Sequence, residues 1–134
     1  MESIEFRHLT HDEEGRMWYQ GKLFTGIAID YWLNGQLASE VNLVDGIEDG
    51  WSRLWSEGGT LTKETFYQKG RATGIRREWH SSGQLKLEKE LEDAICLQSR
   101  EWDEHGNLVD EYLLKEDHPD YRDLQITRSR KIEL

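Results

Sequence analysis

The sequence has one proline, one cysteine and no long run of apolar residues in its 134 positions. A single cysteine cannot form an internal disulfide. One unpaired thiol is typical of a reducing compartment, so we expect a cytoplasmic protein. No apolar stretch approaches the ~20 residues of a membrane-spanning helix, and the first fifteen residues lack the apolar core of a signal peptide. We therefore expect no membrane insertion.

Motifs of the common enzyme classes are also missing. The sequence has no P-loop, no G-x-S-x-G, no G-x-G-x-x-G and no H-E-x-x-H. His8 and His11 are three residues apart, but no third ligand lies near them and no helical pattern surrounds them. No base is placed beside Cys96, which is interpreted as a small buried hydrophobe. We predict no catalytic residues, no metal site, no cofactor and no enzyme activity.

Hydrophobic residues make up only 36% of the chain, and the net charge is −10. Six tryptophans, five tyrosines and three phenylalanines nevertheless favour a folded domain, because disordered chains are poor in aromatic residues. Residues 86–117 carry eleven acidic and four basic side chains. Such a field repels nucleic acid and anionic membranes and speeds encounter with basic partners, so we expect no direct binding of nucleic acid. The alternative is that the charge only keeps the protein soluble.

A repeat with a step of 24 residues organises the chain. The predicted parts of one repeat domain, 1–134, are a lead-in with an incomplete repeat at 1–20, full repeats at 21–44, 45–68 and 69–92, a degenerate capping repeat at 93–116 and a non-repeat tail at 117–134. The recurring positions are a glycine, an aromatic residue, and the leucine and glutamate of a G-x-L-x-x-E core: Gly26, Gly50, Gly74; Tyr31, Trp55, Trp79, Trp102; Leu37, Leu61, Leu85, Leu108; Glu40, Glu64, Glu88, Glu111.

Each full repeat predicts two short strands joined by a turn. Residues 50–56 and 60–67 alternate in type with a period of two, which indicates strands. Between them Glu57, Gly58 and Gly59 are expected to supply the positive φ of a tight hairpin, as Asn34-Gly35, Ser82-Gly83 and His105-Gly106 do in the other copies. An Asp-Gly or Lys-Gly pair then leads into the next hairpin. The fold class predicted is all-β: an elongated, twisted antiparallel meander of ~24-residue β-hairpin repeats.

Stacked repeats would align the recurring side chains in rows across the sheet. The aromatic and leucine rows would stabilise it through cross-strand pairs. A row of glutamates would repel itself unless something offsets it. The alternatives are Arg53, Arg76 and Arg77 nearby, the backbone amides of adjacent turns, or a basic partner. We favour pairing within the sheet, because a binding site seldom needs the same residue in every copy.

The two ends of the chain lie outside the full repeats. At the N-terminus, Ile4, Phe6 and Leu9 are predicted to form one short strand, followed by a polar turn at residues 11–15. At the C-terminus, Pro119 interrupts the strand pattern. Residues 120–134 are expected to form a strand that covers the last edge of the sheet, the alternative being a helix with Asp123 and Gln125 on its polar face.

The repeat closely resembles the MORN repeat over residues 18–112. Its G-x-L-x-x-E phase and its entry segment WYQGKLFTG look like the MORN-variant repeat of YwqK-family antitoxin proteins. The resemblance implies an elongated, twisted, single-layer sheet that binds other macromolecules. For the YwqK-like branch it implies a cytosolic immunity protein. Ala94 and Gln98 at glycine positions, and Gly58 where asparagine is usual, depart from the pattern.

Two functions follow as hypotheses. The first is an immunity protein or antitoxin that neutralises a cognate basic toxin, such as one that acts on nucleic acid, by covering its active site. The second is a structural or scaffold module that mediates protein–protein assembly. Trp32 is expected on the face opposite Tyr31, where it could anchor a partner. The candidate partner-binding residues are Trp32, Trp51, Glu88, Glu90, Glu101, Asp103 and Glu104.

Overall fold

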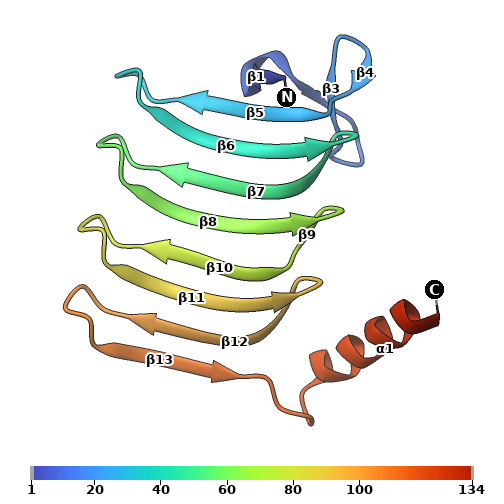
Figure 1. Ribbon diagram of the computed structural model, residues 1–134, viewed down its shortest axis with the longest axis vertical. Helices are drawn as coiled ribbons and strands as arrows, with labels where there is room; N and C mark the ends of the chain where they lie inside the picture. Colours follow the sequence, from blue (N-terminus) through green and yellow to red (C-terminus); the bar gives the residue numbers. More distant parts are fainter. Residues whose placement is uncertain (1, 134) are drawn as a thin grey trace.

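The structure is a computed structural model that describes residues 2–133, and it is dominated by one open sheet of ten strands (Figure 1). The strands of this sheet are β1 (Ser3–Glu5), β5 (Gly26–Tyr31), β6 (Leu37–Val44), β7 (Ile47–Trp55), β8 (Leu61–Gln68), β9 (Arg71–Ala72), β10 (Gly74–Trp79), β11 (Leu85–Glu92), β12 (Ile95–Trp102) and β13 (Leu108–Leu113). From β5 to β13 each strand pairs antiparallel with its predecessor along the main path, and only β1 runs parallel to its neighbour β5. The predicted all-β meander of hairpins is confirmed.

Three further elements flank the meander. A small sheet of β2 (Thr10–His11), β3 (Met17–Tyr19) and β4 (Lys22–Leu23) lies at the N-terminal end, after the short 3-10 helix η1 (Phe6–His8). The chain ends in the helix α1 (Pro119–Glu133). Of the predicted first strand only Ile4 is in β1. Phe6 begins η1 and Leu9 follows it, so the expectation of one strand through all three was wrong.

The hairpin turns inside the repeats are three-residue loops that close on a glycine. The φ angle is +87° at Gly35, +89° at Gly59, +91° at Gly83 and +84° at Gly106. This is the left-handed conformation that such loops need at their last position. Gly58 and its counterparts do not share it, so each turn has one residue at positive φ, and the glycine at the end of the loop supplies it.

The turns between repeats contain two residues, both left-handed. Asp45-Gly46 has φ values of +48° and +78°, and Lys69-Gly70 has +48° and +82°. This is the turn whose twist matches that of the flanking strands. In the degenerate repeat Asp93-Ala94 keeps the same geometry, with φ +69° at the alanine. The Ala94 N–H donates to the Ala72 carbonyl at 2.7 Å, the same bond that the Gly46 and Gly70 N–H groups make to the preceding repeat segment.

The recurring aromatic and leucine residues face each other across every hairpin. The register pairs are Tyr31 with Leu37, Trp55 with Leu61, Trp79 with Leu85 and Trp102 with Leu108. Each pair follows a shift in register, a β-bulge, at the end of the ladder. Bulges increase the local twist of a strand. The same irregularity therefore recurs at the same place in all four repeats.

The buried core lies at the N-terminal end of the sheet. Phe24, Ala28, Val41 and Leu43 are buried there, and the partly buried residues packed on them are Ile4, Phe6, Leu9, Met17 and Tyr19. The lead-in therefore covers the first hairpin. Its β3 also bonds to a turn of the meander, because the Met17 N–H donates to the Gly46 carbonyl at 2.8 Å.

The C-terminal tail is a helix, so the expected edge strand was wrong and the alternative helix is observed. Pro119 suits the first turn of a helix, where an N–H is not needed. Leu124 is only 2% exposed, and two ion pairs join α1 to the sheet. Arg128 donates to both carboxylate oxygens of Glu92 at 2.8 and 3.0 Å, and Lys131 lies 2.7 Å from Asp93. In Figure 1 α1 runs beside the turns that connect the last repeats.

Candidate functional site

Alternation along the strands divides the main sheet into two faces. The core face carries Ala28, Val41, Leu43 and, near the C-terminus, Leu91. The other face, called the ladder face below, carries the recurring glutamates and the aromatic–leucine pairs. His118, just before α1, packs edge-on against Tyr112 of the core face, with ring centroids 6.5 Å apart. The lead-in and the start of α1 thus both lie on the core side.

The glutamates of the repeat alternate with arginines in one row across the ladder face. In order of the paired strands the row is Glu40, Arg53, Glu64, Arg77, Glu88, Arg100 and Glu111. Arg53 lies 3.3 Å from Glu64, and Arg77 lies 3.8 Å from Glu64 and 3.0 Å from Glu88. Opposite charges in register replace the repulsion that a row of glutamates alone would have.

The expectation that nearby arginines offset the glutamates is confirmed for Arg53 and Arg77. Arg76 is on the core face instead and pairs with Glu78 at 2.9 Å. Arg100, which pairs with Glu111 at 3.3 Å, was not anticipated. A signal was present in the sequence, because an arginine stands two residues before the tryptophan in three repeats, at Arg53, Arg77 and Arg100.

Trp51 lies on the ladder face but is engaged by its neighbours. Its ring packs edge-on against Phe66 with centroids 5.1 Å apart, and the Arg53 guanidinium sits 4.8 Å from the ring. Cation–π contact of this kind orients the arginine and adds to the ion pair with Glu64. Trp51 is therefore a half-buried part of the sheet.

Trp32 lies beyond the end of β5, at the first hairpin turn, so strand alternation does not assign it to either face of the sheet. It opens the first hairpin turn and is 37% exposed. Its indole Nε1 donates to the Trp55 carbonyl at 2.9 Å. His80, at the same place two repeats later, lies 2.9 Å from the Trp102 carbonyl. Trp32 thus links one repeat to the next.

The five acidic candidates are divided among three places. Glu88 and Glu90 are on the ladder face, Glu101 is on the core face opposite Asp110, and Asp103 and Glu104 lie in the last hairpin turn. Asp103 accepts bonds from the backbone N–H groups of Asn107 and His105, both at 2.9 Å. The bond from Asn107 in particular lowers the pKa of this carboxyl, so Asp103 is part of the turn itself.

Glu88 and Glu90 border a small hollow on the ladder face. Its volume is about 110 Å³, and its lining residues are Ile75, Glu88, Glu90, Gln98, Ser99 and Arg100. The Gln98 amide donates to Glu90 at 2.7 Å, whereas Glu88 is paired with Arg77. Glu90 has no arginine as a register partner, since Ile75 and Gln98 lie on either side of it. Its carboxylate can therefore accept a donor from a partner.

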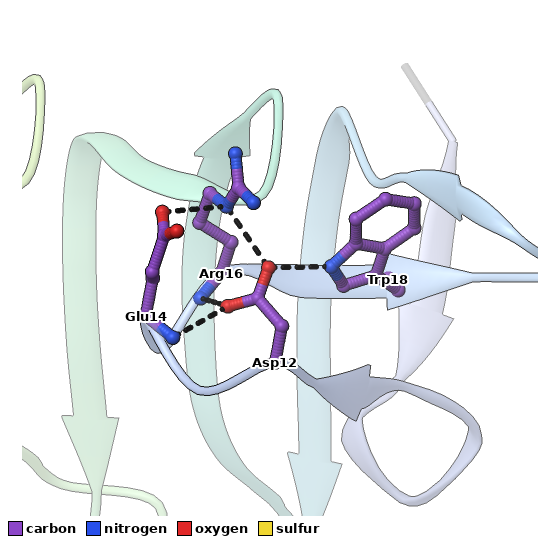
Figure 2. A network of polar contacts seen from close by, with 4 residues as sticks. All are labelled: Asp12, Glu14, Arg16 and Trp18. Atoms are coloured by element: carbon purple, nitrogen blue, oxygen red, sulfur yellow. Dashed lines mark hydrogen bonds and ion pairs between the residues drawn. The ribbon is translucent and has the colours of Figure 1, made fainter.

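A second polar cluster surrounds Asp12 in the lead-in (Figure 2). One carboxylate oxygen of Asp12 accepts from the N–H groups of Glu14 and Arg16, both at 2.9 Å. The other accepts from the Trp18 indole at 2.8 Å and from the Arg16 guanidinium at 2.9 Å. The Trp18 hydrogen bond is the main cause that lowers the pKa of Asp12 from 3.8 to about 2. The cluster confirms the predicted polar turn and holds it against β3.

The Asp12 cluster predicts loss of stability in acid. Because the folded pKa is below the unfolded value, the stabilisation is complete above about pH 4 and disappears as the pH falls through about 2. We expect an Asp12→Asn variant to be less stable than the wild type at neutral pH, with the difference shrinking in acid. Urea unfolding of both proteins across this pH range measures it. A difference that does not change with pH would contradict the assignment.

Cys96 is not placed for nucleophilic chemistry. It is partly buried, and burial is the largest influence on its thiol, with the result that its pKa is raised. A raised pKa keeps the thiol protonated, and the thiolate is the reactive form. Among residues 2–133, no three His, Cys, Asp or Glu side chains are grouped so as to hold a metal ion. No helix in the same range is long and apolar enough to span a membrane.

Comparison with family models finds two matching segments in the chain. A family model described as a MORN repeat variant matches residues 24–45 and 72–93, one segment for the first full repeat and one for the third. No curated protein matches the chain. A similar solved structure is the crystal structure of accessory secretory protein 1, 2 and 3 in Streptococcus pneumoniae, with 12% sequence identity and a TM-score of 0.39. The similarity covers 81% of this chain but only 20% of that one.

Proposed function

We propose that this protein is a protein-binding module that contacts its partner with the ladder face of its C-terminal repeats. The observation that carries the proposal is the rising exposure of the Glu–Arg row. The side chain of Glu64 is 14% exposed, that of Glu88 38% and that of Glu111 56%. The charged side chains at the centre of the row are mostly buried within the sheet, whereas those at its C-terminal end are exposed and available to a partner.

The chemistry of this face supports a protein as the partner. Arginine and tryptophan are enriched among residues that dominate protein–protein binding energy, and both recur here in every full repeat after the first. The shallow hollow beside Glu90 holds about 110 Å³, well below the several hundred Å³ of a typical small-molecule pocket. MORN-type repeats in two parts of the chain agree with a binding or scaffold role.

We further propose that the partner is a basic protein toxin and that this protein neutralises it by covering its active site. The net charge of −10, with its excess of acids in residues 86–117, supports a basic partner because complementary charge speeds association. The resemblance to YwqK-family antitoxins supports a toxin as the partner. Self-assembly as a scaffold is the second candidate, favoured by the exposed leucines Leu108 and Leu113 on the last strand.

Affinity purification of the tagged full chain from its own cells tests the proposal, with co-purified proteins identified by mass spectrometry. We expect one basic protein in stoichiometric amount. Expression of that protein alone should arrest growth, and co-expression of this chain should restore growth. Recovery of further copies of this chain alone would favour the scaffold, and a stoichiometric partner without toxicity would contradict the toxin assignment only.

A further inference from the structure

The sheet ends at β13 with a free edge. Over residues 2–133, β12 is the one strand paired with β13. The Leu114 N–H donates to the Leu97 carbonyl at 2.8 Å, which fixes the alternation of backbone groups along the strand. Because hydrogen-bonded and non-bonded pairs alternate, the N–H and C=O groups of Glu111 and Leu113 point away from β12. Both residues are exposed, so these groups are open to another chain.

The chain itself shows what such an edge accepts. In each full repeat the glutamate strand is followed by a strand that places an arginine opposite the glutamate: Arg53 opposite Glu40, Arg77 opposite Glu64 and Arg100 opposite Glu88. Glu111 has Arg100 on one side and nothing paired on the other within the part of the chain that the structure describes. The alternating row therefore stops on a negative charge.

We propose that β13 binds an extended segment of a different protein as an added antiparallel strand, with an arginine or lysine opposite Glu111. The strands that fill this role inside the chain show the expected pattern. They read W-S-R-L-W at 51–55, I-R-R-E-W at 75–79 and Q-S-R-E-W at 98–102. The arginine is followed two residues later by tryptophan, which pairs with the leucine on the next strand of its own hairpin. Leu108 of β13 is already paired with Trp102, so recognition of the added strand rests on its backbone groups and on the charge opposite Glu111.

A second copy of the same chain fits this edge poorly. Antiparallel pairing of β13 with itself about Glu111, whose backbone groups point outward, would set the Glu111 side chains of the two copies opposite each other on the ladder face. Like charges directly opposite destabilise a sheet. At the other end of the sheet β1 offers only three residues, Ser3–Glu5. Charge complementarity thus selects a basic strand from another protein.

Binding of a labelled peptide with the sequence of residues 50–56, GWSRLWS, to the full chain tests the proposal by fluorescence anisotropy. We expect saturable binding that weakens roughly fivefold when the peptide arginine is replaced by glutamate, the size expected of one cross-strand charge pair. The Glu111→Arg variant should reverse the preference and bind the glutamate peptide better. A Glu104→Arg variant changes the same charge in the neighbouring turn and should keep the original preference.

The backbone contribution is tested with Leu113→Pro and Leu113→Ala. Proline removes an outward N–H that β12 does not use, so it should weaken peptide binding much more than alanine does. Thermal unfolding of each variant confirms that the fold is kept. The proposal would be overturned if the affinity for the peptide did not change when the charge of the peptide or of Glu111 is reversed. It would also be overturned if the chain formed a dimer that Leu113→Pro dissociates. This experiment concerns an edge and not the ladder face, so its failure leaves the proposed function standing.

Discussion

Replacement of Gly46 by alanine is expected to lower the free energy of unfolding by about 3 kcal/mol, the sum of left-handed strain and overpacking. Gly46 has φ +78°, and a β-carbon there would lie 2.6 Å from the Met17 carbonyl oxygen and 2.9 Å from the Met17 nitrogen. Both are backbone atoms of β3, and the same nitrogen donates to the Gly46 carbonyl. Neither atom can move without breaking the contact between the lead-in and the meander.

Gly21 is the matched control for Gly46. It occupies the same position of a two-residue turn with φ +79°, but a β-carbon there would meet nothing within 4 Å. Gly21→Ala should therefore cost only the left-handed strain, about 1 kcal/mol. Chemical unfolding of the two variants and the wild type gives the comparison. Equal losses would show that the approach of β3 to the turn contributes nothing to stability.

Reversal of charge at the centre of the ladder is expected to have the second large effect. Glu64→Arg would place three arginines side by side, because Glu64 lies between Arg53 and Arg77 and its side chain is mostly buried. We expect a loss of about 2 kcal/mol, from two broken ion pairs and two like-charge contacts. Adding Arg77→Glu to the same protein should not restore it, because the attraction gained between positions 64 and 77 is offset by the loss of the ion pair to Glu88 and by a second like-charge contact there.

Glu111→Arg is the control for Glu64→Arg. The same substitution at the exposed end of the row meets one arginine instead of two, so it should cost less than about 1 kcal/mol. Urea unfolding at low and high salt measures both variants. Equal losses at the centre and at the end of the row would contradict the view that the recurring glutamates stabilise the sheet by alternation.

The repeating part of the fold could be predicted from the sequence because its determinants are local. A glycine at the end of each hairpin loop, strands of alternating type and a fixed 24-residue step were enough to give the turns and the order of strands. The pairing of Trp55 with Leu61, which recurs in the other repeats, follows from the same spacing. Each of these features is decided by residues less than one repeat apart.

Features that depend on contacts between neighbouring repeats were harder to predict from the sequence. The partner of Glu64 on β10 depends on a register between repeats, which two-residue turns and bulges determine. The bond from Trp32 to the Trp55 carbonyl likewise crosses from one repeat to the next. The tail is a helix that buries Leu124 and pairs Arg128 with Glu92 of the sheet, and nothing in residues 120–134 alone identifies that partner.

The candidate site residues were predicted from their residue types, and the fold places them on different faces of the sheet. The acidic excess in residues 86–117 suggested one surface, but strand alternation sends Glu90 and Glu101 to opposite faces. The two residues are on adjacent strands, β11 and β12, and both are partly buried. They therefore offer a direct comparison of the two faces with the same change of charge.

The central claim is that the ladder face binds the protein partner, and the affinity of the purified partner for Glu90→Lys and Glu101→Lys tests it most directly. Titration calorimetry at physiological salt, with unfolding curves to confirm that both variants fold, gives the two dissociation constants. We predict weaker binding for Glu90→Lys by roughly tenfold, as for loss of a good interface charge, and nearly unchanged binding for Glu101→Lys. The reverse order, or equal losses, would place the partner elsewhere and contradict the account.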